Sequence, residues 1–173
     1  PEALLNYIVR LGWSNGDQEI FSVQEMIDLF ELKNINNSPA SFNQEKLDWI
    51  NQSYIKSTDI ENLVKNLEWH LNNLNINLDN GPSIYELAES LRERSKSLVD
   101  MAMSCVMFYC DFDAFDLVQA NKVFNTKSRS ILEDLAVNLN LIDNWTAENI
   151  HSVIKIVCEK HDVGFGKVGQ PFR

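Results

Sequence analysis

The fold class of this sequence is decided by the stretch Thr58-Asp59-Ile60-Glu61-Asn62-Leu63-Val64-Lys65-Asn66-Leu67-Glu68-Trp69-His70-Leu71-Asn72-Asn73-Leu74. Its apolar residues, from Ile60 to Leu74, recur every three or four positions, which places them on one face of a helix. Thr58 and Glu61 have the spacing of a capping box, in which the hydroxyl and the carboxylate each bind a backbone N–H. The stretch therefore predicts an amphipathic helix that begins after Thr58.

Other parts of the chain show the same spacing. Ser22 and Glu25 form a second predicted capping box, and Thr146 is a predicted helix cap. Further apolar stripes occupy residues 84–91, 98–108, 131–139 and 150–157. Alternation of apolar and polar residues over five or more positions, which is typical of strands, is hard to find. The sequence therefore predicts an all-α fold, with turns at 34–39 and 72–82.

The composition is that of a packed, acidic protein. The chain has 173 residues, of which 45% are hydrophobic and 23% charged, and its formal net charge is -10. Such a charge repels polyanions, which argues against a protein that coats nucleic acid or an anionic membrane nonspecifically. No apolar run approaches the roughly 18 residues of a membrane span, and no secretory signal is visible. We therefore expect a cytoplasmic protein with no membrane partner.

No motif in the sequence predicts a catalytic centre. The glycine-rich stretch 164–169 resembles a phosphate loop in composition only, and because it follows a predicted helix it favours a C-terminal cap and turn. The run 127–130 favours a basic first turn of a helix. Asp111, Asp113 and Asp116 lack the glycine and the distal glutamate of a calcium loop, which favours a solvated acidic surface. We expect no catalytic residue and no cofactor in this chain.

A metal site is not predicted either. Cys105, Cys110 and Cys158 are odd in number and lack a C-x-x-C motif, which favours a reducing compartment and three small buried thiols. The histidines at positions 70, 151 and 161 are too scattered to complete a four-ligand zinc site.

Basic residues gather in two short segments. Residues 1–91 carry a net charge of -9 and residues 101–150 one of -4, whereas 92–100 carry +1 and 151–173 carry +2. The first positive segment holds Arg92, Arg94 and Lys96 at the end of a predicted helix. Arginine suits the recognition of base edges or phosphate, but on spacing alone a basic turn that complements the helix dipole is favoured.

Five blocks of sequence resemble one family in order. They are Pro1–Ser14 (PEALLNYIVRLGWS), Gly16–Phe21, Phe42–Asn51, Asp143–Asn149 and Gly166–Arg173. These blocks resemble the part of bacterial glutamyl-tRNA synthetases that follows the catalytic domain. Since the chain starts at Pro1 directly in a predicted helix and stops just after a glycine-rich stretch, we expect it to be a piece of a longer protein.

The resemblance implies an activity for the longer protein and a domain organisation for this chain. The family is of class I aminoacyl-tRNA synthetases, which couple glutamate to tRNA-Glu with ATP and magnesium, and we expect the full-length enzyme to be monomeric. The family's two catalytic signature motifs are absent from this sequence, so we expect the chain to bind tRNA without aminoacylating it. The resemblance implies a helical stem-contact domain at 1–57 and an incomplete helical anticodon-binding domain at 58–173.

Two residues match family positions that contact the anticodon. Arg94 matches the family arginine that recognises the third anticodon base. An arginine at this position resembles the one in family members that accept tRNA-Glu and reject tRNA-Gln. Arg173 matches the arginine of a Pro-Leu-Arg motif beside the first anticodon base, although Phe172 replaces the leucine here. The alternative hypothesis is an acidic helical module that binds proteins and no RNA.

Overall fold

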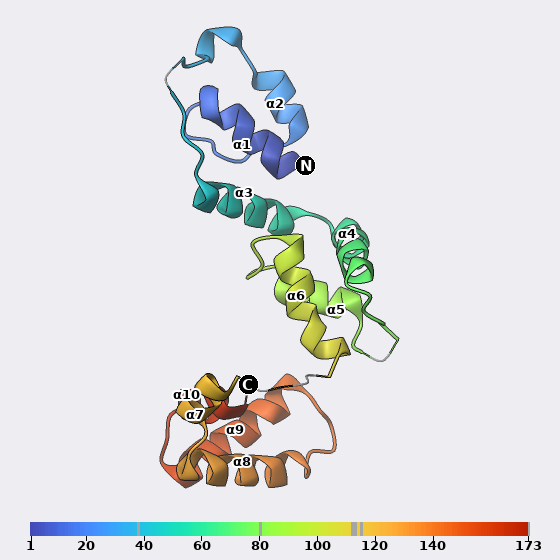
Figure 1. Ribbon diagram of the computed structural model, residues 1–173, viewed down its shortest axis with the longest axis vertical. Helices are drawn as coiled ribbons and strands as arrows, with labels where there is room; N and C mark the ends of the chain where they lie inside the picture. Colours follow the sequence, from blue (N-terminus) through green and yellow to red (C-terminus); the bar gives the residue numbers. More distant parts are fainter. Residues whose placement is uncertain (38, 80, 112–113, 115, 173) are drawn as a thin grey trace. The chain divides into compact units, whose positions relative to one another are not determined.

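The structure is a computed structural model that describes residues 1–37, 39–79, 81–111, 114 and 116–172. Within these residues it consists of helices and loops, with an isolated bridge between Trp13 and Ile35 as the one β-type pairing (Figure 1). The predicted all-α fold is confirmed. The elements in order are α1 (Glu2–Gly12), α2 (Val23–Leu29), the 3-10 turn η1 (Leu32–Asn34), α3 (Gln44–Ser57), α4 (Ile60–Asn73), α5 (Ile84–Leu91), α6 (Leu98–Tyr109), α7 (Leu117–Val123), α8 (Thr126–Leu139), α9 (Ala147–His161) and α10 (Phe165–Phe172).

The chain folds into two compact units, residues 1–111 and 112–173, which we call the N-terminal and C-terminal units. In the N-terminal unit, α1 packs along α3. Tyr7 and Ile50 are buried between these two helices, and Trp13 and Phe21 are buried under α2. The predicted capping box of Ser22 and Glu25 is confirmed at the start of α2.

A second core of this unit lies among α4, α5 and α6. The apolar stripe of α4 is buried as its spacing predicts, with Leu67 and Leu71 inaccessible to solvent. Leu91 of α5 and Met101 of α6 pack against this stripe. Ile55 of α3 belongs to the same cluster, so α3 contributes to both cores of the N-terminal unit.

The predicted cap of α4 is wrong by one residue. The helix begins at Ile60, and the carboxylate of Asp59, not the hydroxyl of Thr58, accepts the N–H of Asn62 (3.0 Å). This hydrogen bond to the backbone lowers the pKa of Asp59. Thr58 instead ends α3, where its hydroxyl donates to the carbonyl of Tyr54 (2.7 Å). Two capping residues in succession let one helix end and the next begin without a linker.

The C-terminal unit is built on the packing of α8, α9 and α10. Ile131 and Leu135 of α8 contact Val157 of α9 and Val168 of α10 in one buried cluster. The predicted cap of α9 is confirmed, since the hydroxyl of Thr146 accepts the N–H of Asn149 (3.2 Å). The predicted basic first turn at 127–130 is confirmed in α8.

The stretch 164–169 is not the cap and turn that its glycines predict. α9 ends at His161, its C-cap Asp162 takes a left-handed conformation (φ 50°), and α10 then includes Gly166 and Gly169. Val168 explains the difference, because it is fully buried against α8 and α9. Burial of this side chain outweighs the cost of placing glycine in a helix, which is about 1 kcal/mol per residue relative to alanine.

The cysteines are partly as predicted. All three are unpaired, and Cys105 is buried in the core of the N-terminal unit. Burial raises the pKa of the Cys105 thiol. The prediction is wrong for Cys110, which is exposed because α6 ends at Tyr109, and Cys158 is only partly buried.

Candidate nucleic-acid interface

The segment 92–97, which we call the basic turn, connects α5 to α6. The carbonyl of Leu91 accepts the backbone N–H groups of Arg94 and Ser95 (both 3.1 Å) and the hydroxyl of Ser95 (2.9 Å). Ser95 is buried, whereas most serines in proteins are exposed. At the other end, the hydroxyl of Ser97 accepts the N–H of Asp100 (3.1 Å) and caps α6.

Side chains of helix α3 bind residues of the basic turn. The side-chain amide of Asn51 donates to the carbonyl of Lys96 (2.7 Å), and that of Gln52 donates to the carbonyl of Glu93 (3.0 Å). Lys56 adds an ion pair with Glu93 (3.0 Å). These partners lie 37 to 45 residues before the basic turn, so the turn is fixed by tertiary contacts as well as by its own hydrogen bonds.

Arg92 does not belong to the solvent-facing basic cluster that the sequence suggests. Its guanidinium donates to the carbonyls of Ile55 (3.3 Å), Lys56 (2.7 Å) and Thr58 (2.5 Å) at the end of α3. It also pairs with Glu89 (2.9 Å), and its side chain is only 14% exposed. These carbonyls have no helical partner, so Arg92 satisfies the end of α3 and attaches it to α5.

Arg94 is arranged in the opposite way. The residue is exposed, and within the described part of the chain its guanidinium has no hydrogen bond and no ion pair. Lys96, two residues on, is also exposed and forms no ion pair within the same residues. A free guanidinium on a turn that is fixed at both ends can donate several hydrogen bonds to a ligand with little loss of backbone freedom.

The second predicted anticodon residue, Arg173, lies outside the described residues. Two residues of the same block, Lys167 and Pro171, are placed in α10. Of the residues considered for a calcium site, Asp113 is also outside the described residues, while Asp111 and Asp116 are exposed as predicted and Asp116 caps α7. Across the residues with described positions, no three His, Cys, Asp or Glu side chains converge as metal ligands.

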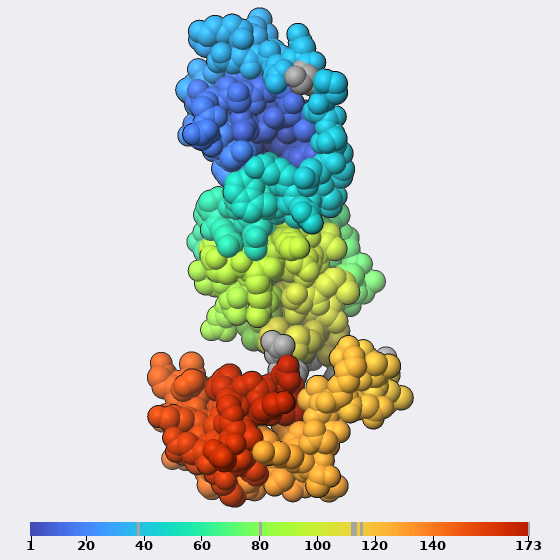
Figure 2. All heavy atoms as spheres, turned by 90° about the vertical axis from the view of Figure 1, so that its left-hand side faces the viewer, coloured from blue at the N-terminus to red at the C-terminus, as the bar shows by residue number. Residues whose placement is uncertain are grey.

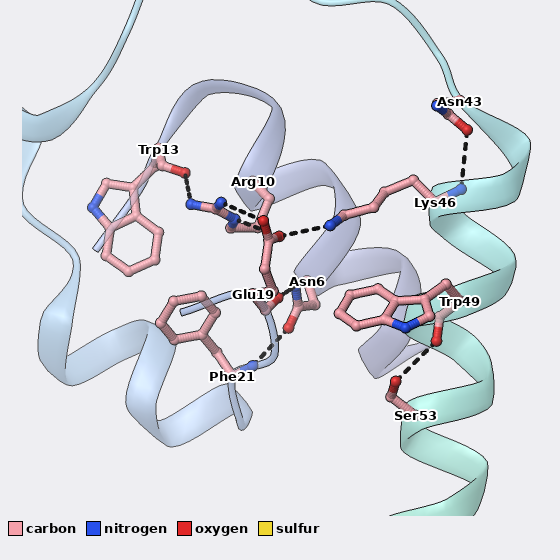
Figure 3. Close-up of polar contacts among 9 residues, drawn as sticks. All are labelled: Asn6, Arg10, Trp13, Glu19, Phe21, Asn43, Lys46, Trp49 and Ser53. Atoms are coloured by element: carbon pink, nitrogen blue, oxygen red, sulfur yellow. Dashed lines mark hydrogen bonds and ion pairs between the residues drawn. The ribbon is translucent and has the colours of Figure 1, made fainter. Parts of the chain in front are cut away.

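A polar cluster of the N-terminal unit surrounds Glu19 (Figure 3). Arg10 of α1 binds both carboxylate oxygens of Glu19 (3.1 and 3.3 Å), and Lys46 of α3 binds one of them (2.9 Å). The hydrogen bond from Lys46, together with Arg10, lowers the pKa of Glu19. Beneath it, the buried amide of Asn6 binds the backbone of Glu19 and Phe21 (2.9 and 2.7 Å). Each cation in this cluster has a partner within the protein, so the cluster holds α1 to α3.

Sequence reasoning missed the residues that position the basic turn. Asn51 ends a block that resembles the family and Gln52 follows it, but no local signal connects either residue to a turn about 40 residues later. Arg92 carried the same basic signal as Arg94, and the sequence offered no means of separating the two.

In the described residues, no helix is both long and apolar enough to cross a membrane.

Comparison with known proteins gives two family matches. Residues 62–173 match the model of an anticodon binding domain. Residues 1–49 match the model of the catalytic domain of class I tRNA synthetases for glutamate and glutamine. The second match includes α1 and the first part of α3, so the division of the chain at residue 57 stays a prediction.

Individual proteins agree with these matches. The chain is 52% identical over all 173 residues to the glutamate–tRNA ligases of Ruthia magnifica subsp. Calyptogena magnifica and Vesicomyosocius okutanii subsp. Calyptogena okutanii (strain HA). It spans 38% of the length of these relatives.

Solved structures give the same result. The crystal structure of a glutamate tRNA ligase from Elizabethkingia meningosepticum CCUG26117 in complex with its amino acid matches the whole chain with 28% identity and a TM-score of 0.84, over 34% of its own length. A glutamate-tRNA synthetase from Elizabethkingia anophelis matches with 27% identity and a TM-score of 0.79, again over 34% of its length. With the family model covering residues 62–173, the chain belongs to the anticodon binding domain family.

Proposed function

We propose that this chain recognises the anticodon of tRNA-Glu as the C-terminal part of a glutamate–tRNA ligase. The observation that carries the proposal is the free, exposed guanidinium of Arg94 on a turn that α3 holds in place, within the residues that match the anticodon binding domain. In this proposal Arg94 contacts the third anticodon base and Arg173 lies beside the first.

The chemistry of the third base explains the preference for tRNA-Glu. A cytosine presents oxygen and nitrogen acceptors on its pairing edge, which two N–H groups of a guanidinium can satisfy together. A guanine at that position, as in tRNA-Gln, presents O6 as its one acceptor beside N–H donors on the same edge, so it cannot accept both N–H groups of Arg94. Such a mismatch typically costs about 1–3 kcal/mol.

The other properties of the ligase are proposed from the relatives. We place the ATP and magnesium sites in the part of the ligase outside this chain, so the chain alone would bind tRNA without charging it. The ligase would be monomeric and cytoplasmic, with neither DNA nor membrane as a partner. Residues 1–57 would contact the tRNA stem and 58–173 the anticodon.

Filter binding with the 173-residue chain at several salt concentrations tests the proposal. We expect tRNA-Glu to bind more tightly than tRNA-Gln, with an affinity that falls as salt rises because counterions are released. Arg94→Ala and Arg94→Gln should each weaken tRNA-Glu binding by about 1–3 kcal/mol and remove the preference for cytosine over guanine.

Lys65→Ala is the matched control, because Lys65 is an exposed cation of α4 without an ion pair in the described residues. It removes the same charge and should keep the base preference. An unchanged preference in both Arg94 variants, repeated in the full-length ligase, would show the assignment of Arg94 to be wrong. ATP-dependent charging by the chain alone would contradict the placement of the catalytic site. An absence of RNA binding would favour the protein-binding alternative.

A further inference from the structure

A hollow of about 210 Å³ in the C-terminal unit gathers three lysines. Lys122 comes from the end of α7, Lys127 from the first turn of α8 and Lys167 from α10. Asn125 and Gln170 add amide groups, and Ile131 forms part of an apolar floor. We call this feature the lysine hollow. Both α7 (gold) and α10 (red) reach the surface on the face of this unit that Figure 2 shows.

The charge of the lysine hollow is not neutralised by the protein. No acidic side chain is among its described lining residues. Within the described residues none of its three lysines forms an ion pair, whereas Lys33, Lys46, Lys56 and Lys160 each bind a carboxylate. The first acidic residue of α8, Glu133, is bound to Arg129 (3.0 Å). Three like charges beside an apolar floor repel each other, and a bound anion would relieve that repulsion.

The start of α8 adds to the same field. This helix has 14 residues, and its N-terminal end carries the positive end of the helix dipole. The side chain of Asn125 accepts the N–H of Ser128 (3.0 Å), but the N–H groups of Thr126 and Lys127 have no acceptor among the described residues. The unpaired N–H of Lys127, which lines the hollow, and the three lysine side chains are donors of the kind that phosphate groups bind.

We propose that the lysine hollow binds the phosphate group of a nucleotide in a bound RNA chain, with the ribose or base against the apolar floor. This inference rests on the proposed function, because RNA is the source of the phosphate. It differs from that function in what the residues do: the lysines hold the backbone regardless of sequence, while Arg94 distinguishes bases.

The test compares two variants of the 173-residue chain with equal charge. In one, Lys122, Lys127 and Lys167 are replaced by alanine; in the other, Lys33, Lys65 and Lys155 are replaced. Binding of the tRNA-Glu anticodon stem-loop is measured across a salt series. We expect the hollow variant to lose about tenfold or more in affinity and to decrease the salt slope by about 1, the contribution of one phosphate contact. The control variant should change by less than about threefold.

Amide chemical shifts identify the site and the source of the phosphate. Addition of the stem-loop should shift the amide signal of residue 127 in the unmodified chain and in the control, but not in the hollow variant. Cytidine monophosphate and inorganic phosphate should cause the same shifts only at much higher concentration. Shifts from cytidine monophosphate without shifts from RNA would contradict RNA as the source. Equal affinities of the two variants would contradict the site itself.

The outcome is separable from that of the proposed function. If the inference holds, the hollow variant loses affinity for tRNA-Glu and tRNA-Gln alike and keeps the preference between them. If only the proposed function holds, Arg94→Ala loses the preference while the hollow variant behaves as the control does. Loss of the preference in the hollow variant, with its affinity kept, would overturn the assignment of the lysines to the backbone.

Discussion

The basic turn of the N-terminal unit and the lysine hollow of the C-terminal unit both gather cations in an acidic chain, but they use them differently. In the basic turn, the guanidinium of Arg92 donates to backbone carbonyls at the end of α3. The side chains of Arg94 and Lys96 have no partner in the described residues. In the lysine hollow, none of the three cations has a partner in the described residues. A cation is therefore available to a ligand only where the surrounding fold offers it no acceptor.

The two units also differ in net charge. Residues 1–111 hold 17 acidic and 8 basic residues, a net charge of -9, whereas residues 112–173 hold 8 acidic and 7 basic residues, a net charge of -1. A selective contact therefore suits the N-terminal unit, where the acidic surface repels nonspecific RNA. A sequence-independent phosphate contact suits the C-terminal unit, where the repulsion is smaller.

The largest effect on stability should come from Arg92→Ala. Its removal leaves the carbonyls of Ile55, Lys56 and Thr58 without their donor, in a place that is largely shielded from water. We expect the free energy of unfolding to fall by about 2–4 kcal/mol, measured by urea denaturation. Arg94→Ala is the control and should change it by no more than about 0.5 kcal/mol. Equal effects of the two variants would remove the distinction between them.

Smaller effects should follow from Asn51→Ala and Gln52→Ala. Each loses one hydrogen bond to a carbonyl of the basic turn, which should lower the free energy of unfolding by about 1 kcal/mol. The same variants should weaken the base preference that depends on Arg94, because the turn becomes less fixed. Gln44→Ala is the control, since within the described residues the side chain of Gln44 binds only Asp48 on its own helix (2.6 Å). Variants that retain both stability and preference would show that α3 does not position the turn.

Acid should destabilise the C-terminal unit through Asp134. The hydrogen bonds from Lys160 (2.8 Å) and His161 lower the pKa of this carboxyl below its usual value of 3.8. A lowered pKa in the folded state means that the stabilisation is present above about pH 4 and is lost as the pH falls further. Thermal unfolding from pH 6 to pH 3 should show this loss, and Asp134→Asn should reduce it. A pH dependence identical in both proteins would contradict the assignment.

The smallest effect should come from replacing the three lysines of the lysine hollow by alanine. Since none of them binds an acceptor within the described residues, the free energy of unfolding should change by no more than about 0.5 kcal/mol. At low salt it should rise slightly, because the repulsion among three like charges is removed. Urea denaturation at two salt concentrations measures this. A loss above about 1 kcal/mol would mean that the lysines serve the fold.

Local patterns in the sequence were sufficient where a structure depends on neighbouring residues. The stripe of Leu63, Leu67 and Leu71 predicted a helix and its buried face, because residues three or four apart lie on one side. Ser22 and Thr146 predicted their caps, since a cap binds an N–H group two or three residues away. Thr58 failed as a cap because Asp59, the next residue, occupies that position.

Tertiary contacts decided the remaining features. Spacing and composition were sufficient to predict the all-α class, the buried faces of the main helices and the charge balance. Only the fold decided that the glycines of α10 are helical, through the burial of Val168. Only the fold separated Arg92 from Arg94 and brought Lys122 and Lys167 to one hollow. The physical reason is that such contacts join segments about 35 to 45 residues apart, whose proximity no local pattern contains.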